Sequence, residues 1–525
     1  MNAGELQSHS PGKPGIDIAS LLDPECYPHP VRHLRMHETA ISWVLLTGPY
    51  AYKVKKPVRL EFIDAATLPR RRFLCEEEVR LNRRFAPDLY RDVVPIGLEH
   101  GRTRIGAAGS ALEYAVRMQQ FEPSQELASL LEHHHVTGAE LGAFGGRLAQ
   151  WHQAAQPAQA HAGYGTAALV RAQALENFEA LQASNAAAAA RLHWLQRWTL
   201  DRLGQLEELM TRRARSGQVR ECHGDLHSGN VVRWDGQLLP FDCVEFEPRL
   251  RWIDVISDVA FLFMDLVGRA RTDLAHAFLS AYLEQGGDYE GVRLLAFYGV
   301  YRALVRAKVD AIALAGHAGG SDPTHRQHLE GRLQTALRLT SSDQAALVLM
   351  HGVTASGKSW IAERLIGALP AIRVRSDIER KRLPAATQPA LAAQRYSTAA
   401  TQATYSRVLE CAASALEGGQ SVVVDATFLD PAQRSRFEAL AGRLRRPWLI
   451  LSCTASRTVL LQRLSQRAQH GGDPSEATRE VLDQQLQALQ PLGQSECAAT
   501  VKINTDHPVS IDGLLSTLRQ QLGRC

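Results

Sequence analysis

The sequence lacks the patterns that mark secreted, membrane-spanning and zinc-stabilised proteins. Its 8 cysteines include no C-x-x-C pair, and scattered cysteines are typical of reduced thiols in a cytosolic protein rather than of a disulfide framework or a zinc site. No uninterrupted apolar run is long enough to span a bilayer, and the opening residues, MNAGELQSHSPGKPG, lack the apolar stretch of a signal peptide. We therefore expect a cytoplasmic protein with no membrane partner.

Aromatic residues and net charge are also low. Phe, Trp and Tyr make up 6% of the chain and the formal net charge is +4, which argues against a dedicated nucleic-acid groove. The 45% hydrophobic and 22% charged content is typical of a globular protein. Because 525 residues exceed one ordinary core, we expect two or more domains. Nothing in the sequence indicates an oligomeric state.

Residues 346–359, ALVLMHGVTASGKS, form a P-loop pattern. An apolar strand runs into Gly-x-x-x-x-Gly-Lys-Ser, and an amphipathic helix follows from Trp360, which is the context that the motif requires. A glycine-rich surface turn is the alternative, and the flanking elements disfavour it. The residues predicted to cradle a nucleotide phosphate are Gly352, Val353, Thr354, Ala355, Ser356, Gly357, Lys358 and Ser359. Lys358 is expected at the β- and γ-phosphates and Ser359 at Mg²⁺.

Two acidic residues follow predicted strands of this second half. Asp377 comes after the strand 371–375, and Asp425 ends the apolar strand that begins at Ser421. Open α/β sheets bind ligands beyond the carboxyl ends of their strands. We therefore expect Asp425 to contact Mg²⁺ directly or through water, although many strand-end acids only cap a loop.

A basic helix is predicted over residues 457–470. Arg463 and Arg467 are spaced i, i+4 and so share one face, and the following 471–475 segment, GGDPS, is predicted to be a mobile turn. A lid of this kind can bring arginines to a transferring phosphoryl group. A solvated basic face explains the same spacing equally well, and the sequence leaves the two interpretations open.

The first half opens with a predicted hairpin, 41–46 and 50–55, followed by a charged helix over residues 68–85. Side-chain alternation places Lys53 on the same face as Ala51 and Lys55. The helix carries the run Glu76, Glu77 and Glu78. A strand lysine paired with a helix glutamate is the arrangement with which protein kinases hold ATP phosphates, but solvated charges are the commoner explanation of such residues.

The segment 219–258 carries the most informative pattern of the first half. It contains HGDLHSGN over residues 223–230, then two short strands, the second ending at Asp242. Asp225, Asn230 and Asp242 can converge on one nucleotide, with the first accepting the proton of an acceptor hydroxyl and the other two holding Mg²⁺. An acidic loop between two strands is the alternative.

HGDLHSGN followed by Phe-Asp resembles the aminoglycoside phosphotransferase and choline kinase branch of the protein-kinase-like superfamily. This resemblance implies Asp225 as catalytic base, Asn230 and Asp242 as Mg²⁺ ligands, Lys53 as the phosphate-binding lysine and Glu77 as its helix partner, with the register among Glu76, Glu77 and Glu78 left open. It also implies structural roles for His223, Asp254 and Asp258. The chain departs from the pattern in one respect, since the first hairpin contains no G-x-G-x-x-G loop.

The second half resembles the P-loop kinases grouped with zeta toxin, chloramphenicol phosphotransferase and gluconate kinase. The match rests on S-D-x-x-R at 376–380, VVVDAT at 422–427, and R-x-x-x-R followed by D-x-S-x-A at 473–477. It implies that Asp377 binds or deprotonates the acceptor hydroxyl, and that Arg463 and Arg467 stabilise phosphate. The whole chain resembles bacterial proteins that join a phosphotransferase-like domain to such an ATP-binding domain.

The sequence thus predicts an α+β protein-kinase-like bilobal domain followed by an α/β P-loop NTPase domain with a parallel sheet. The expected divisions are an irregular segment 1–38, a first domain 39–340, a linker 341–345 and a second domain 346–525. The leading functional hypothesis is a phosphotransferase that uses ATP and Mg²⁺ and phosphorylates a small hydroxylated molecule. Two alternatives stay open: a nucleotide-sensing regulator or toxin-like ATPase, and a nucleic-acid-end kinase, against which the low charge and aromatic content argue.

Overall fold

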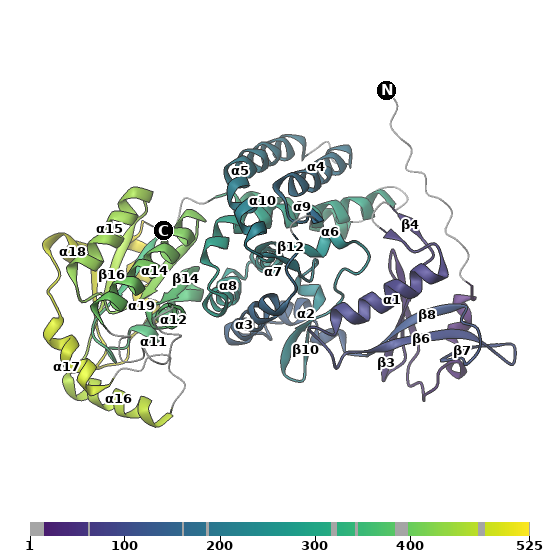
Figure 1. Cartoon of the computed structure of the whole chain (residues 1–525), viewed down its shortest axis with the longest axis horizontal. Helices are drawn as coiled ribbons and strands as arrows, with labels where there is room; N and C mark the ends of the chain where they lie inside the picture. Colours follow the sequence, from purple (N-terminus) through teal and green to yellow (C-terminus); the bar gives the residue numbers. More distant parts are fainter. Residues whose placement is uncertain are drawn as a thin grey trace. The chain divides into compact units, whose positions relative to one another are not determined.

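The computed structural model describes residues 15–60, 63–159, 162–184, 188–316, 323–341, 345–383, 397–470 and 478–523 (Figure 1). They form two compact units that are interleaved along the sequence. The first comprises Met1–Val136, Ala154–Leu169 and Met210–Asp258, and the second comprises Thr137–Gln153, Val170–Leu209 and Val259–Cys525. The predicted boundaries, 39–340 and 346–525, are contiguous in sequence and stay a prediction. Most of the predicted linker, residues 342–344, lies outside the described residues.

The first unit is built on a six-stranded antiparallel sheet of order β1-β2-β3-β8-β6-β7. The predicted hairpin is confirmed, whereas β1 and β7 were not predicted. The strands are β1 (Arg35–Glu38), β2 (Ser42–Leu46), β3 (Tyr50–Lys55), β6 (Tyr90–Glu99), β7 (Arg102–Ile105) and β8 (Glu113–Gln119).

The two faces of this sheet are covered by different segments. On one face Ala51 of β3 packs with Cys75 and Val79 of helix α1 (Leu68–Asn82). On the other face Tyr52 and Val54 pack with the N-terminal 3₁₀ turns η1 (Ile18–Leu22) and η2 (Pro24–Cys26). The period of two along β3 therefore directs Lys53 and Lys55 toward α1.

The rest of the first unit carries short elements that hold the 222–245 region in place. β9 (Val219–Glu221) pairs with β12 (Trp252–Asp254), and β10 (Val231–Trp234) pairs with β11 (Gln237–Pro240), both antiparallel. The remaining elements are β4 (Arg59–Leu60), β5 (Ile63–Asp64), η3 (Pro123–Gln125), α2 (Leu127–Glu132), η6 (Ser228–Asn230) and α6 (Pro248–Arg251).

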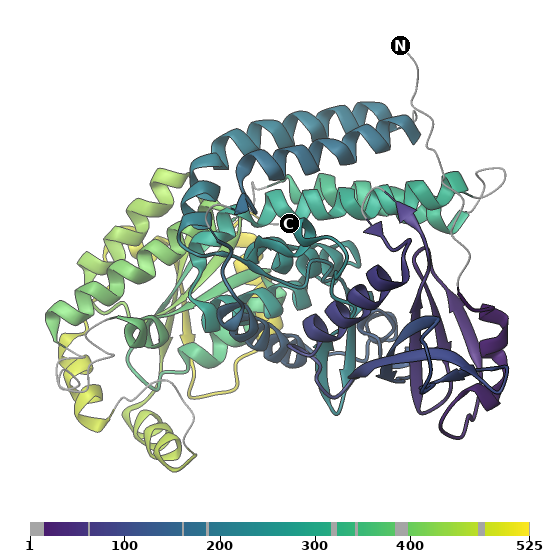
Figure 2. The same ribbon diagram turned by 45° about the vertical axis from the view of Figure 1, so that its right-hand side comes forward.

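The second unit contains the long helices and the P-loop sheet (Figure 2). Apolar side chains of four helices, among them Phe178, Leu192, Leu304 and Leu333, share one buried cluster with Phe261. The helices that lie mostly in this unit are α3 (Gly138–Ala154), α4 (Ala167–Ser184), α5 (Ala189–Arg215), α7 (Val255–Gly268), α8 (Thr272–Gly286), α9 (Val292–Gly316) and α10 (Pro323–Leu339), with η7 (Tyr289–Gly291) before α9.

The P-loop sheet has five strands in the order β14-β15-β13-β16-β17, and all their pairings are parallel. A parallel sheet is covered on both faces, so its strands are nearly continuous apolar runs, as in the LVLMH of β13. This explains why the sequence predicted them well. The strands are β13 (Leu347–His351), β14 (Ala371–Arg375), β15 (Ser421–Asp425), β16 (Trp448–Thr454) and β17 (Thr500–Asn504).

Helices from the beginning and from the end of the 346–525 region pack on this sheet. α11 (Lys358–Ala368) and α19 (Ile511–Gln521) share a core cluster with β13 and β16, while α14 (Thr398–Glu417) packs against β14 and β15. The other helices are α12 (Ser376–Arg382), α15 (Pro431–Leu444), α16 (Arg457–His470), α17 (Arg479–Ala488) and α18 (Gln494–Ala498). Of these, α15 and α18 were not predicted.

Two global properties can be stated for the described part of the chain. The seven cysteines that it contains form no disulfide, and six of them are buried. Its helices include none that combines the length and the apolar composition needed to cross a membrane.

Candidate functional site

Lys53 and Glu78 form the ion pair on which the first site is built. The Lys53 ammonium on β3 donates to Oε1 of Glu78 on α1 at 3.0 Å, and the Glu78 side chain is fully buried. The prediction of Glu77 as the partner is wrong by one residue. Glu78 lies on the sheet-facing side of α1 with Cys75 and Val79, whereas Glu77 binds Arg80 at 2.8 Å.

Lys55, which was predicted on the same face of the strand as Lys53 but without a role, binds the same glutamate. Lys55 Nζ donates to the other Glu78 oxygen and, at 2.5 Å, to Oε1 of Glu245. Lys55 is fully buried and Glu245 is 3% exposed. Burial lowers the pKa of Lys55, but the Glu245 and Glu78 carboxylates outweigh it and raise that pKa. Each oxygen of Glu78 therefore has its own lysine.

Asp242 brings a second carboxylate to Lys53. It accepts a hydrogen bond from the Lys53 ammonium, and its backbone N–H donates to the Tyr90 hydroxyl at 3.0 Å. Its φ of 61° places it in the left-handed region. Burial raises the pKa of Asp242, but the adjacent Lys53 overrides this and lowers it. The Asp242 side chain is 43% exposed, so a ligand can reach it.

Asp225 and Asn230 meet at the loop that precedes β10. The Asn230 amide nitrogen donates to the backbone oxygen of Asp225 at 3.0 Å and to its Oδ2 at 3.1 Å. The Asp225 side chain is 35% exposed, and His227 Nε2 lies 3.5 Å from its Oδ2. The Asn230 amide nitrogen donates to Asp225, and the Asn230 amide oxygen is the atom that can bind a metal. Together with the Asp242 carboxylate it offers the hard oxygen ligands that Mg²⁺ takes in proteins.

Buried groups fix this loop from behind, as the sequence predicted. Asp258 accepts from the backbone N–H groups of His223 and Gly224, both at 2.9 Å, and Nε2 of His223 bonds to the Phe241 carbonyl at 2.9 Å. Burial lowers the pKa of His223. Asp254 forms a bidentate pair with Arg213 at 2.8 and 2.9 Å. The structural roles of His223, Asp254 and Asp258 are confirmed.

The second site is the loop between β13 and α11. Gly352 has φ 131°, and a Cβ there would lie 2.3 Å from the Cys453 carbonyl oxygen, so only glycine fits. Gly357, with φ 87°, is the N-cap of α11. The backbone N–H groups of such a loop and the helix N-terminus form an anion-binding concavity.

Lys358, Ser359 and Asp425 lie together beside this loop. Lys358 Nζ donates to the Val353 carbonyl at 2.7 Å; burial lowers its pKa, with Asp425 acting in the opposite direction. The Ser359 hydroxyl donates to the Asp425 carboxylate, and burial raises the pKa of Asp425 against the effects of Lys358 and Ser359. A hydroxyl and a carboxylate in contact fit the Mg²⁺ ligand pair of a P-loop.

The remaining predicted residues of this half have different placements. Asp377 lies in the first turn of α12, near enough for its charge to act on Lys358, and Arg467 also acts on that lysine. Arg463 braces the loop, donating to the Ala355 carbonyl at 3.1 Å and to the Thr505 carbonyl at 2.6 Å. Its role at a transferring phosphoryl group stays a prediction. The predicted mobile turn, 471–475, lies outside the described residues.

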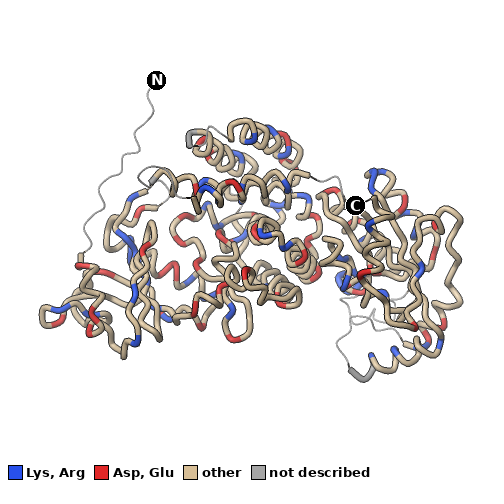
Figure 3. Tube along the Cα trace, turned by 180° about the vertical axis from the view of Figure 1, so that it is seen from behind, with Lys and Arg blue, Asp and Glu red and all other residues tan. Residues whose placement is uncertain are grey.

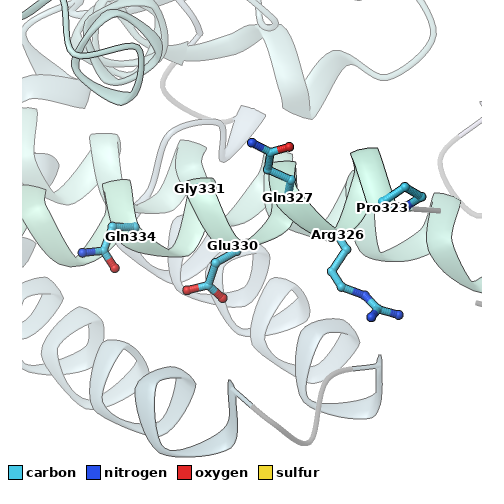
Figure 4. A pocket seen from close by; sticks show the side chains of 6 residues that line it. All are labelled: Pro323, Arg326, Gln327, Glu330, Gly331 and Gln334. Atoms are coloured by element: carbon cyan, nitrogen blue, oxygen red, sulfur yellow. The ribbon is translucent and has the colours of Figure 1, made fainter. Parts of the chain in front are cut away.

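The hollow shown in Figure 4 is separate from both sites. Its lining residues all come from α10 and include Arg326 and Glu330. None of them belongs to the groups described above, so the hollow does not enter the assignment of function.

The two sites define the class of protein. Residues 65–295 match the profile described as "Phosphotransferase enzyme family", and residues 347–492 match that of an AAA domain. The chain is a kinase-like phosphotransferase domain followed by a P-loop domain, which confirms the predicted fold class together with the five parallel strands of the P-loop sheet.

Curated proteins are similar to this chain over most of its length. Uncharacterized protein Rv2004c of Mycobacterium tuberculosis and Uncharacterized protein Mb2027c of Mycobacterium bovis are each 30% identical to this chain over 473 residues, which is 87% of this chain and 91% of theirs. The chain belongs to the family of these proteins.

Solved structures resemble portions of this chain. A choline/ethanolamine kinase family protein from Mesorhizobium loti covers 59% of this chain and 88% of its own length, with 13% identity and a TM-score of 0.35. A gluconokinase from Sinorhizobium meliloti 1021 covers 35% of this chain and 93% of its own length, with 20% identity and a TM-score of 0.26.

Proposed function

We propose that the chain is an ATP-dependent phosphotransferase with two phosphoryl-transfer sites and that its acceptors are small hydroxylated molecules. The observation that carries the proposal is the convergence of Lys53, Glu78 and Asp242 in the unit that also holds the Asp225–Asn230 pair. Phosphoryl transfer needs a cation for the phosphates, oxygen ligands for the metal and a carboxylate for the acceptor. This group of residues supplies all three.

In the first site each residue has one task. Lys53 binds a nucleotide phosphate, because an ammonium has three donors and Glu78 and Asp242 engage only two of them. Asp242 and the Asn230 amide oxygen hold Mg²⁺, which supplies neutralisation of the phosphate charge when bound. Asp225 orients the acceptor hydroxyl and takes its proton as the oxygen forms its bond to the γ-phosphorus. The bond from that phosphorus to the β,γ-bridging oxygen breaks, and ADP leaves with the electron pair.

In the second site the loop backbone and Lys358 bind the nucleotide phosphates. Ser359 and Asp425 hold Mg²⁺, and Asp377 orients the acceptor hydroxyl. Arg467 supplies positive charge near the transferred group, where such charge is most effective. Arg463 acts indirectly by holding the loop and the Thr505 backbone together.

The test is ATP turnover, measured with pooled sugars, amino alcohols, aminocyclitols and nucleosides as acceptors. Lys358→Ala and Asp225→Asn are made singly and together. The controls are Lys502→Ala and Asp235→Asn, which change exposed residues of the same types. Each single variant is expected to remove the turnover of one site, and the double variant to remove all of it.

The outcomes separate the proposal from its alternatives. If neither single variant lowers turnover, the assignment of two sites is wrong. Tight nucleotide binding without turnover, in the presence of Mg²⁺ and the acceptor pool, would identify a nucleotide-sensing regulator. Turnover that requires a nucleic-acid end, with binding that falls steeply with salt, would identify a nucleic-acid kinase. Basic and acidic positions are interspersed along the described trace in Figure 3, which supports the small-molecule proposal.

A further inference from the structure

Helix α8 packs on the P-loop sheet within the second unit. The two elements come from different family regions, since α8 lies in the 65–295 phosphotransferase match and β14 lies in the 347–492 AAA match. The contact between them is polar and specific. Residues of the phosphotransferase region therefore lie beside the second nucleotide site.

The backbone of the edge strand is satisfied by residues of the helical region. The Arg373 N–H on β14 donates to the Ser280 hydroxyl of α8 at 3.0 Å. The Arg373 carbonyl accepts from the Tyr289 hydroxyl of η7 at 3.3 Å. The backbone groups of Arg373, which another strand would otherwise bind, are thus occupied. These bonds fix the position of α8 along β14.

Glu284, near the end of α8, binds two arginines of that strand. Its Oε2 accepts from Arg373 at 3.1 Å and its Oε1 accepts from Nη1 of Arg375 at 3.0 Å. All three side chains are less than a fifth exposed. Charge-assisted hydrogen bonds between poorly solvated groups are the stronger class of such bonds, so Glu284 determines where Arg375 points.

The position of Arg375 matters because Asp425 is its direct neighbour. The two residues are in register across β14 and β15, and successive side chains alternate between faces, so both project to the same side. Yet the nearest atoms, Nε of Arg375 and Oδ2 of Asp425, are 4.0 Å apart. The guanidinium is closer to Glu284 than to the carboxylate assigned to Mg²⁺.

We propose that Glu284 is a positioning residue of the P-loop site, which holds Arg375 away from Asp425 and so keeps the Asp425 carboxylate accessible to Mg²⁺. The inference rests on the proposed function of this site. Without the Glu284 charge, Arg375 closes the 4.0 Å gap and pairs with Asp425. The metal must then compete with a guanidinium for the same oxygens.

The test measures how much Mg²⁺ is needed for a non-hydrolysable ATP analogue to bind the full-length protein in an Asp242→Asn background, which removes a proposed Mg²⁺ ligand of the first site. Glu284→Gln keeps the size of the side chain and removes its charge. We expect it to raise the half-saturating Mg²⁺ concentration about tenfold, the effect of losing one charge-assisted bond. Glu410→Gln, a change of an exposed acid on α14, is the matched control and is expected to leave the value unchanged.

A second substitution separates positioning from folding. In Glu284→Gln/Arg375→Gln the competing cation is gone, so the Mg²⁺ requirement is expected to return to within about twofold of the parent. A loss of packing would not be repaired by removing another side chain. The inference is overturned if Glu284→Gln leaves the Mg²⁺ requirement unchanged, or if the double variant is worse than the single.

The proposed function of the site fails in a different way. If the Asp242→Asn parent binds the analogue with an Mg²⁺ requirement that changes with Glu284→Gln, but turns over no ATP, then transfer at the P-loop site is wrong while the positioning role stands. If the parent turns over ATP and its Mg²⁺ requirement does not change with Glu284→Gln, then transfer at the P-loop site stands and the positioning role is wrong. Thermal unfolding of every variant shows that the protein compared is folded.

Discussion

Lys53 and Asp242 form an ion pair in the first unit although they are 189 residues apart in the sequence. The pair joins the second strand of the predicted hairpin to the end of β11. Glu78 of α1 accepts another hydrogen bond from the same ammonium. The phosphate-binding cation of the proposed site is therefore fixed by three separate segments of the chain.

Replacing the carboxylate of Asp242 is expected to disable the first site without unfolding the unit. Asp242→Asn keeps the size of the side chain and a residue type that tolerates the φ of 61°, but removes the charge that faces Lys53. We expect ATP turnover in a Lys358→Ala background to fall about a hundredfold or more. Asp235→Asn, on the exposed turn of the same hairpin with φ 46°, should retain full turnover.

The second lysine of the first unit is expected to stabilise the fold. Lys55→Met leaves the buried Glu245 with no cation and takes one of the two lysines from Glu78. Breaking a buried pair in this way costs about 3–5 kcal/mol of unfolding free energy, which urea denaturation would measure. Lys56→Met should cost less than about 1 kcal/mol, because its partner Glu38 is 60% exposed.

A further variant distinguishes charge from packing at Lys55. Lys55→Met/Glu245→Gln removes the uncompensated carboxylate as well, so part of the lost stability should return. Equal stability of the single and double variants would show that the cost comes from the shape of the side chain and not from the buried charge.

Stability is expected to fall on acidification because of His351, at the end of β13. Burial lowers the pKa of this imidazole to about 4 from an ordinary value of 6.5. The unfolded chain therefore takes up a proton below pH 6.5 that the folded chain refuses until about pH 4. Linkage converts that difference into a loss of up to about 3 kcal/mol of unfolding free energy between those values.

The measurement compares urea denaturation of the wild type with that of His351→Gln at pH 7.5 and pH 4.5. The glutamine can retain the hydrogen bond to Ser452, which is 2.9 Å from Nδ1, but cannot take up the proton. The variant should lose less stability than the wild type over this range. An identical loss in both proteins would assign the acid sensitivity to other groups.

The first glycine of the P-loop is expected to be irreplaceable. Gly352→Ala would place a Cβ 2.3 Å from the Cys453 carbonyl oxygen, so strand or loop must shift and nucleotide affinity at this site should fall at least about tenfold. Gly442→Ala, in the last turn of α15 where a Cβ meets nothing within 4 Å, should instead add up to about 1 kcal/mol of stability. Calorimetric titration with ADP and thermal unfolding test the two expectations.

The sequence predicted those parts of the structure that depend on neighbouring residues. The strand β13 and the P-loop are local patterns, and so are the HGDLHSGN loop and the acids that follow strands. The choice among Glu76, Glu77 and Glu78 was not local, because it depends on how α1 is rotated against the sheet. The buried residues Cys75 and Val79 on either side of Glu78 carried that signal, since residues three and four apart share a helix face.

Contacts between segments that are distant along the chain could not be predicted from the sequence. Lys55 and Glu245 are 190 residues apart, and no residue near either one indicates that they pair. The acceptors of Arg463 were also not predicted, because one of them is the backbone of Thr505, 42 residues away. The pairing of Glu284 with Arg375 likewise depends on the packing of a helix from one family region on a strand from another.

The cover that α8 and Tyr289 give to the edge strand β14 bears on how such a chain can evolve. A P-loop domain cut out at residue 346 would present the outward backbone groups of Arg373 to solvent, and an open strand edge is a template for pairing with other chains. A protein that received this domain without a helix equivalent to α8 would therefore carry an open strand edge. In this chain one family region completes the surface of the other.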